Sequence, residues 1–320
     1  MPGSGTRTFL EPDHYEASLR QAQIEIIIAL SPRFKARLSW AELHDLQVFR
    51  CEEDFPRVAY VRLAPRLSFV TFPAHSGPLP VWGGTELRPG EIVLHGRGER
   101  SHQSTSGSGV WNVLAIDRLR LEQYCRALTG KPFSLPQDGK ILHPAARDAA
   151  RLRRLHAQVC RLAETKPRLL AHTEVARALE QSLIQALVAC VTRASMRASA
   201  VKRRHARVMI MLEEVLADYL SKPLRMSELC ELIGVSERTL RSCCAQFLGM
   251  SPIRYVLSRR LSRARIALRD AEPDRANLLA LVRGLGFTEF GRFEAAYRAA
   301  FSETPLTTLQ RAPAARFINP

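Results

Sequence analysis

The sequence lacks the patterns that mark secreted, membrane and disulfide-bonded proteins. Its seven cysteines form no C-x-x-C pair, and their odd number does not resemble a disulfide framework. The longest strongly apolar stretch, Ile24–Leu30, contains Glu25 and is far shorter than the roughly 20 residues of a membrane helix. A charged and then apolar signal segment is also missing. We therefore expect a protein of the reducing cytoplasm with no membrane partner.

Patterns for catalysis and metal binding are missing as well. The sequence has no H-x-H pair, and His95 and His102 stand seven residues apart, so we predict no metal ion and no other cofactor. Thr129-Gly130-Lys131 is followed by Pro132 where a phosphate-binding loop has Ser or Thr. No Ser/His/Asp or Cys/His set can be singled out. The sequence therefore predicts a protein that is not an enzyme.

Positive charge is what the sequence has in excess. The 320 residues include 47 Lys and Arg against 31 Asp and Glu, for a net charge of +16. This charge favours a polyanionic partner such as nucleic acid. Residues 1–200 hold 27 basic and 19 acidic side chains and residues 201–320 hold 20 and 12, so each part nets +8 and the charge alone does not locate the binding surface. The length exceeds one usual domain and predicts two folded units.

The first 135 residues have the pattern of an antiparallel β domain. Short β-branched and aromatic runs alternate with clusters of Gly and Pro. The runs are Ile24–Leu30, Leu46–Phe49, Val58–Leu63, Leu67–Phe72, Glu91–Leu94 and Val110–Ile116. We predict a β barrel or sandwich over residues 1–135. Because the rest of the chain has a helical pattern, the predicted fold class is α+β with more than one domain.

Residues 136–196 change to the helical period, with two apolar stripes separated by a break at Lys166–Pro167. This pattern predicts a helical hairpin, whose stripes form either intrachain core or a dimerisation element. Residues 197–205 are small, polar and basic, which is typical of a linker. We predict an all-helical domain over the segment that follows, residues 206–313.

A helix-turn-helix pattern occupies Met226–Leu248. Ser227 is placed to cap a short helix, Gly234 can adopt the left-handed turn that ends it, and Ser236 can cap the next helix. In such a motif the second helix lies in the major groove of DNA, with its N-terminal residues against the base edges. Two arginines one turn apart suit bidentate contacts with guanine. The exposed positions expected there are Glu237, Arg238, Arg241 and Ser242.

The same layout recurs at residues 277–301. A short apolar segment is followed by a turn at Gly286, a capping residue at Thr288 and a second helix. Between the two patterns, Pro252–Asp270 predicts one helix with arginines around a buried stripe of Leu257, Leu261, Ala264 and Leu268. Such a helix fixes the separation of two DNA-reading units, and some of its arginines would contact phosphates.

These motifs together resemble the DNA-binding domain of the AraC/XylS family of bacterial regulators. Four of them keep their order and spacing over about a third of the chain. They are G-V-S-E-R-T-L at 234–240, L-G-M-S-P at 248–252, R-L-S-R-A-R at 260–265 and G-F-T-E-F-G-R-F-E-A-A-Y-R-A-A-F at 286–301. The resemblance implies a C-terminal all-α domain of two helix-turn-helix units joined by a linker helix.

The resemblance also implies which residues read DNA bases. These positions fall on Arg238, Arg241 and Ser242 in the first unit and on Phe290, Gly291, Glu294 and Ala295 in the second. The first set keeps two strong donors and the second does not, so we predict that the first unit supplies most of the sequence discrimination and the second mainly docks on the backbone through Arg292 and Arg298. The chain departs from the family pattern at Cys244, Val282, Gly284 and Ser302.

The N-terminal part resembles the cupin-like sensor domains of such regulators, and residues 87–102 match their turn and strand. The resemblance implies a barrel that binds a small-molecule effector or mediates dimerisation. We expect aromatic and imidazole side chains in the wall of its site and an arginine that orients an acidic group. The candidate residues are Phe69, Phe72, Trp82, His95, His102 and Trp111, with Arg97 or Arg100.

The sequence thus predicts a homodimeric regulator of transcription that binds double-stranded promoter DNA and a small-molecule effector, and that contacts RNA polymerase if it is an activator. Two alternatives stay open. One is a cupin-type enzyme with a helical accessory domain, and the other is a ligand-independent regulator whose barrel is filled by side chains.

Overall fold

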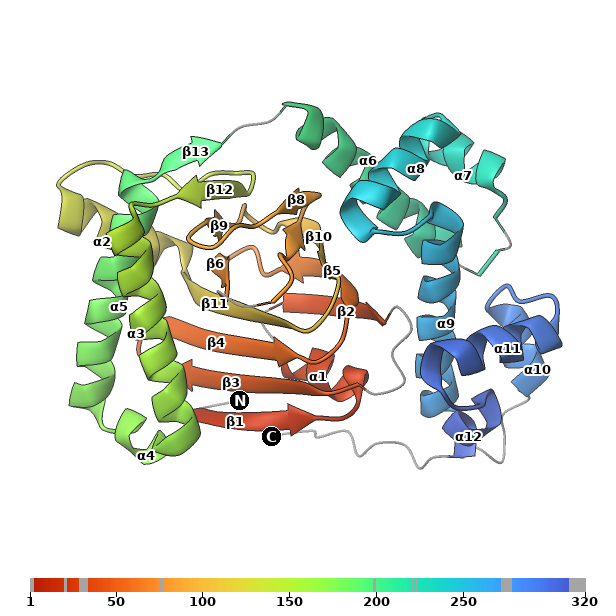
Figure 1. Cartoon of the computed structure of the whole chain (residues 1–320), viewed down its shortest axis with the longest axis horizontal. Helices are drawn as coiled ribbons and strands as arrows, with labels where there is room; N and C mark the ends of the chain where they lie inside the picture. Colours follow the sequence, from red (N-terminus) through yellow and green to blue (C-terminus); the bar gives the residue numbers. More distant parts are fainter. Residues whose placement is uncertain are drawn as a thin grey trace. The chain divides into compact units, whose positions relative to one another are not determined.

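The computed structural model describes residues 3–19, 22–28, 34–74, 77–197, 200–219, 221–222, 224–271 and 278–310. The chain divides into two compact units (Figure 1). Unit 1 comprises residues 1–26 and 34–200, and unit 2 comprises residues 27–33 and 201–320. The predicted β domain and helical hairpin therefore belong to one unit, and the predicted helical domain forms most of the other.

Unit 1 contains two sheets, and each pair of neighbouring strands with a described register is antiparallel, which confirms the predicted β architecture. The larger sheet has the order β1-β3-β4-β11-β6-β9-β12-β13, with β1 Ser4–Phe9, β3 Ala36–Glu42, β4 Leu46–Glu53, β11 Gly109–Asp117, β6 Leu67–Pro73, β9 Ile92–Leu94, β12 Lys140–His143 and β13 Ser195–Arg197. The smaller sheet has the order β2-β5-β10-β7-β8, with β2 Ala22–Ile28, β5 Arg57–Leu63, β10 Arg100–Thr105, β7 Val81–Trp82 and β8 Thr85–Glu86.

Strand alternation decides which side chains face the interior between the sheets. Successive side chains of a strand point to opposite faces, so every second residue shares a face. On β4 these are Phe49, Cys51 and Glu53, and Trp111 of β11 lies directly opposite Cys51 in the register. The other face of the large sheet carries Val48, Val70 and Leu114, which belong to the apolar core that the helices cover.

Five helices complete unit 1: α1 Pro12–Ser18, α2 Arg118–Thr129, α3 Ala146–Thr165, α4 Pro167–Leu170 and α5 Thr173–Arg193. Helices α3 and α5 pack against each other as the predicted hairpin, and Pro167 starts α4 at the predicted break (Figure 1). Asp117 caps α2 by accepting hydrogen bonds from the Leu119 and Arg120 amides at 2.9 and 3.2 Å. The hairpin thus covers one face of the large sheet.

Helix α5 is long and apolar enough to span a membrane by length and composition alone. Its composition has another explanation in this fold. Leu183, Leu187 and Val191 are buried in the core that α5 shares with α3 and the large sheet. The apolar residues of α5 therefore serve packing inside unit 1.

Unit 2 consists of helices, which confirms the predicted all-α domain: α6 Ala200–Tyr219, α7 Met226–Ile233, α8 Glu237–Leu248, α9 Pro252–Asp270, α10 Leu278–Gly284, α11 Phe290–Phe301 and α12 Pro305–Gln310. The helix α6 begins at Ala200, so most of residues 197–205 are helical and differ from the linker that their composition predicts. Residues 311–313, the end of the predicted domain, lie outside the described residues.

Buried ion pairs hold the helices of unit 2 together. Glu213 of α6 is 1% exposed, accepts a hydrogen bond from the Tyr255 hydroxyl and pairs with Arg259 Nη2 at 3.1 Å. Arg265 pairs with Glu303 at 3.3 Å. Two arginines of the basic helix α9 are therefore structural, because removing either partner would leave a buried charge uncompensated.

Three local predictions in unit 2 are wrong. Ser227 lies inside α7, whose N-cap is Arg225, and the Glu228 carboxylate accepts from the Arg225 amide at 2.7 Å in its place. Thr288 precedes the N-cap of α11, which is Glu289 without a side-chain cap bond. On α9 the predicted stripe is buried at Leu261, Ala264 and Leu268, but Leu257 is 39% exposed, and Tyr255 and Val256 are buried near that end of the helix instead.

Candidate DNA-binding face and candidate effector cavity

The first helix-turn-helix is formed by α7 and α8. Helix α7 ends at Gly234, whose φ of 74° lies in the left-handed region that glycine adopts without steric cost. The Ser236 hydroxyl then caps α8 by accepting from the Thr239 amide at 3.2 Å. Leu240, Cys243, Cys244 and Phe247 are buried on one face of α8. The opposite face exposes Glu237, Arg238, Arg241 and Ser242, the positions that the sequence predicts to face DNA.

An ion pair occupies Arg241 in the DNA-free chain. Its Nε and Nη2 atoms lie 2.8 and 2.6 Å from Oε1 of Glu237, one helical turn earlier. Both side chains are more than half exposed, so water screens the pair and its contribution is about 0.3–0.5 kcal/mol. Arg238 has no ion pair within the described part of the chain. Of the two predicted base-reading arginines, only Arg241 is therefore held by a carboxylate within the described residues.

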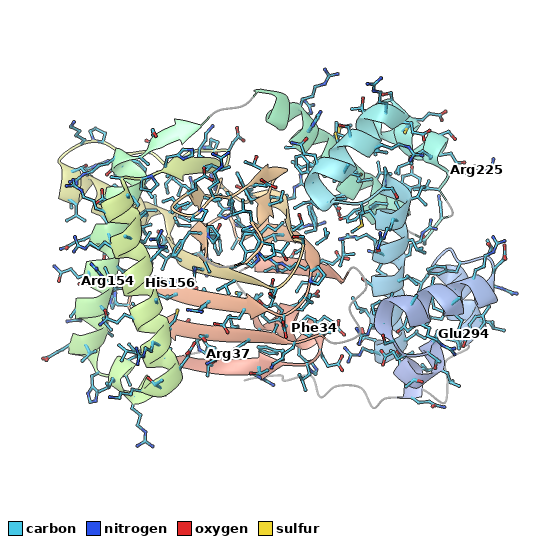
Figure 2. All side chains as sticks on the ribbon, viewed as in Figure 1. Phe34, Arg37, Arg154, His156, Arg225 and Glu294 are labelled. Carbon is cyan, nitrogen blue, oxygen red and sulfur yellow. The ribbon has the colours of Figure 1, made fainter. Side chains whose placement is uncertain are left out.

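The second helix-turn-helix is formed by α10 and α11, with Gly286 at φ 83° in the turn. Phe290 is half-buried, and its ring centroid lies 5.9 Å from that of Phe293 in the core of this half. Gly291 and Ala295 are exposed. Arg292 pairs with Glu289 at 3.0 Å and Arg298 with Glu294 at 3.9 Å, and Figure 2 labels Glu294 on α11. Acidic residues thus accompany both predicted backbone contacts.

A cavity of about 70 Å³ lies between the two sheets of unit 1. Its wall is mostly apolar and alternates along each strand: Phe49 on β4, Val61 and Leu63 on β5, Phe69 on β6 and Val113 on β11. Polar side chains from the strands, from helix α1 and from the segment after β9 also line the cavity. These are Tyr15, Cys51, Glu53, Arg57, Thr71, His95, Gln103 and Trp111.

A buried ion pair forms the polar end of this cavity. Arg57 Nη1 lies 2.9 Å from Glu53 Oε1, and the Tyr15 hydroxyl donates to the same oxygen at 2.9 Å. Arg57 Nη2 donates to Gln103 Oε1 at 3.0 Å, and the guanidinium lies 5.2 Å from the Trp111 ring centroid. Burial raises the pKa of Glu53, and the charge of Arg57 and the bond from Tyr15 partly offset this. The short contacts to Arg57 and Tyr15 are those of an ionised carboxylate.

Burial also keeps the neighbouring thiol and phenol protonated. Desolvation raises the pKa of Cys51 to about 12, and the charge of Glu53 adds to the effect. The pKa of Tyr15 is raised for the same first reason. Neither group carries charge at neutral pH, so the ion pair is the charged element at this end of the cavity.

A second polar cluster surrounds His95. Its Nε2 atom lies 2.9 Å from Thr71 Oγ1 and its Nδ1 atom 3.0 Å from Glu99 Oε1, which also accepts from Trp82 Nε1 at 2.9 Å. Burial raises the pKa of Glu99, but the facing His95 and three hydrogen bonds lower it more, so the pKa lies below its usual value. Within the described residues, no group of three or more His, Cys, Asp and Glu side chains is placed to hold a metal ion.

The structure brings only some of the predicted effector residues to this cavity. His95, Trp111 and Phe69 line it. Phe72 lies on the opposite face of β6, against His156, at a ring distance of 5.1 Å. His102 neighbours Gln103 and so faces away from it, with its ring 5.0 Å from that of Tyr60. Phe72, Trp82, Arg97 and His102 are not among the lining residues, because strand alternation and the Gly96 loop turn them elsewhere.

Sequence reasoning missed the polar residues that matter most in this cavity. Glu53 on β4, Arg57 on β5 and Gln103 on β10 are all buried, although polar residues are usually exposed. The available signal for the ion pair was the spacing of Glu53 and Arg57, which stand four residues apart between two predicted strands. The acidic partners on α8 and α11 were visible in the same way, because Glu237 and Arg241, like Glu294 and Arg298, have i,i+4 spacing.

Comparison with known proteins locates the similarity in unit 2. A family model described as a helix-turn-helix domain matches residues 229–311. Over 105 residues the chain is 30% identical to the XylDLEGF operon transcriptional activator of Pseudomonas putida, which covers 33% of this chain and 32% of that protein. This segment is an AraC-type helix-turn-helix domain. The chain therefore spans about a third of the length of the curated relatives it matches.

Solved structures of similar proteins include a probable AraC family transcriptional regulator from Rhodopseudomonas palustris. It is 28% identical over 33% of this chain and 98% of the other, with a TM-score of 0.30. The AraC-like transcriptional activator CuxR is 16% identical over 82% of this chain and 94% of the other, with a TM-score of 0.43.

The four residues that depart from the family pattern have different structural environments. Cys244 and Val282 are buried to 0% and 1% exposure, so both serve the core. Gly284 is exposed at the C-terminal end of α10. Ser302 ends α11 at φ 56°, the only positive φ of a non-glycine residue among those described, whereas Gly249 ends α8 at φ 66°. The second half of the AraC-type domain thus carries a strained helix end that the first half avoids.

Proposed function

We propose that this protein is a sequence-specific, DNA-binding regulator of transcription of the AraC/XylS type, acting on double-stranded promoter DNA. The observation that carries the proposal is the exposed N-terminal half of α8, where Arg238 and Arg241 stand one turn apart on a helix fixed by the Gly234 turn and the Ser236 cap. Such a helix fits the major groove, and each arginine can contact the O6 and N7 atoms of a guanine.

The two halves of the domain have different roles in this proposal. Arg238, Arg241 and Ser242 read bases, with Glu237 beside them. In the second half Glu294 can accept only from the amino group of cytosine, while Phe290 is partly held in the core. The second half therefore docks on the phosphate backbone, through Arg292 and Arg298. Docking of both halves along one face of the duplex would span about 10 base pairs.

The N-terminal unit controls DNA binding in this proposal through a small-molecule effector. The cavity between the two sheets supports this, because it is lined by apolar residues and holds a few convergent polar groups. The helical hairpin of α3 and α5 is our candidate for homodimerisation in the cytoplasm, and activation would add a contact with RNA polymerase. The activating relatives motivate the choice of activator over repressor.

The test is selection of bound DNA from a random pool by the full chain. The proposal is supported if the selected DNA shares a motif with guanines and if the preference for these guanines depends on Arg238 and Arg241. Binding should weaken with salt, with a log–log slope near −0.9 for each phosphate neutralised. The matched variants are Arg241→Ala and Glu294→Ala. No enrichment at all refutes sequence-specific binding, and relaxed preference in Glu294→Ala with unchanged preference in Arg241→Ala refutes the assignment of roles.

A further inference from the structure

Three polar atoms at the charged end of the cavity have no hydrogen-bond partner among the described residues. They are Oε2 of Glu53, Nε of Arg57 and Nε1 of Trp111. The three residues are 3%, 4% and 2% exposed, and all three line the cavity. A buried polar group left unpaired is destabilising, so three such groups on cavity-lining residues indicate that a further molecule pairs with them.

The hydrogen bonds that these residues already make show which of their donors and acceptors are available to a bound molecule. Oε1 of Glu53 accepts from Arg57 and Tyr15, and each Nη atom of Arg57 donates one hydrogen bond, to Glu53 and to Gln103. The atoms that make no described hydrogen bond are one acceptor, Oε2, and two donors, Nε and Nε1. A matching group must therefore both donate and accept hydrogen bonds.

Charge restricts the occupant further. Glu53 and Arg57 neutralise each other at 2.9 Å. An anion or a cation would bring one uncompensated charge into a wall made of side chains such as Phe49, Val61 and Phe69, which is expensive in a medium of low polarity. The occupant should therefore be neutral overall, with an apolar body against those side chains.

Size sets the last limit. The cavity of about 70 Å³ is smaller than the roughly 300–1,000 Å³ of usual ligand pockets, so the molecule must be compact. We infer that the cavity binds a compact, neutral molecule whose apolar body carries a hydroxyl or carboxamide group, held by Glu53, Arg57 and Trp111. The inference rests on the proposed effector control and names the chemical class of the effector. It departs from the acidic group that the sequence alone led us to expect.

The experiment uses the full chain without DNA and four probes with the same branched skeleton: isobutyramide, isobutanol, isobutyrate and isobutylamine. Binding is measured by ligand-observed NMR titration. We expect saturable binding of isobutyramide and isobutanol and at least tenfold weaker binding of the charged pair. The inference is overturned if neither neutral probe shows saturable binding, or if a charged probe binds more tightly than the neutral ones.

Two variants of the same type test the position of the ligand. Trp111→Phe removes the unpartnered indole N–H of a residue that lines the cavity, and it should weaken the binding of isobutyramide about tenfold, the usual effect of one lost hydrogen bond. Trp40→Phe removes an equally unpartnered indole N–H that does not line the cavity, and it should leave the affinity within about twofold. Equal effects of the two variants would refute the proposed contact and favour ordered water as the partner of these atoms.

A cavity-filling variant covers the case in which Trp111→Phe fails to fold. Val61→Leu adds one methylene to the wall without touching the polar cluster, and it should reduce the affinity for both neutral probes by at least fivefold. Unchanged affinity would place the probes elsewhere and overturn the inference. Failure here leaves DNA selection by the same protein unaffected, so it can be told apart from failure of the proposed function.

Discussion

The Glu237–Arg241 pair allows one prediction to be worked through in magnitude. Arg241 Nε and Nη2 lie 2.8 and 2.6 Å from Glu237 Oε1, and the two side chains are 56% and 52% exposed. Breaking such a pair costs about 0.3–0.5 kcal/mol. A bidentate contact from arginine to guanine discriminates by about 1–3 kcal/mol. The gain exceeds the cost, so Arg241 should leave Glu237 when the protein binds its preferred DNA.

Two substitutions separate these contributions. Arg241→Ala should weaken binding to the selected sequence by about 5- to 150-fold, the equivalent of about 1–3 kcal/mol, while binding to random DNA falls by much less. Glu237→Gln frees Arg241 and should strengthen binding to the selected sequence by about twofold, from the 0.3–0.5 kcal/mol of the lost pair. The assay is fluorescence anisotropy on the selected duplex and on one scrambled duplex, at a single stated salt concentration.

The control is Arg298→Ala on α11, because Arg298 also has an i,i+4 acidic partner, Glu294 at 3.9 Å. As a proposed phosphate contact, Arg298 should affect both duplexes by similar factors. If Arg241→Ala weakens the selected and the scrambled duplex equally, Arg241 contacts only the backbone. If Glu237→Gln weakens binding to the selected duplex, Glu237 orients Arg241 for DNA instead of competing with it.

The remaining predictions concern stability and thiol chemistry. Burial lowers the pKa of His156 to about 4, and its Nε2–H donates to the Phe49 carbonyl at 3.1 Å from α3, where Figure 2 labels it. Since the folded pKa lies below the usual 6.5, stability is full above about pH 6.5 and falls by about 1.4 kcal/mol per pH unit down to pH 4, about 3 kcal/mol in all. Urea unfolding between pH 4.5 and 7.5 should show this slope, and His156→Gln should remove it; an equal slope in the variant would assign it to other groups. Ser302→Gly should stabilise unit 2 by about 0.5–1 kcal/mol, because φ at this position is 56°. Gly249→Ser should destabilise unit 2 by a similar amount, and thermal unfolding measures both changes. If Ser302→Gly is less stable than the unchanged chain, the serine hydroxyl compensates the strain. Desolvation raises the pKa of Cys244 to about 12, and Cys243 is also fully buried, so neither thiol of the folded protein should react with iodoacetamide at pH 8 and DNA affinity should be insensitive to peroxide; rapid labelling of either would contradict this.

The two helix-turn-helix units follow from local signals, and this is why the sequence predicts them well. Gly234 and Ser236 act within a few residues of themselves, and the exposed face of α8 follows from the helical period. Where a neighbouring element competes for the same helix, the local prediction fails. Leu257 is exposed because α6 places Glu213 against the Tyr255 and Arg259 face of α9, and no pattern within α9 indicates that partner.

The sequence by itself determined that an antiparallel β unit with a helical hairpin precedes an all-α unit with two helix-turn-helix motifs, because alternation, helical period and turn residues are local properties. Tertiary structure alone decided which polar side chains meet in the β unit. Glu53 and Arg57 stand on strands of different sheets, and Tyr15 and Gln103 reach them from a helix and a third strand. The Glu53–Arg57 pair has a local signal in its spacing of four residues, but its contacts with Tyr15 and Gln103 depend on sheet packing and strand register, which couple residues far apart in the chain. For that reason the cavity could not be predicted from the sequence.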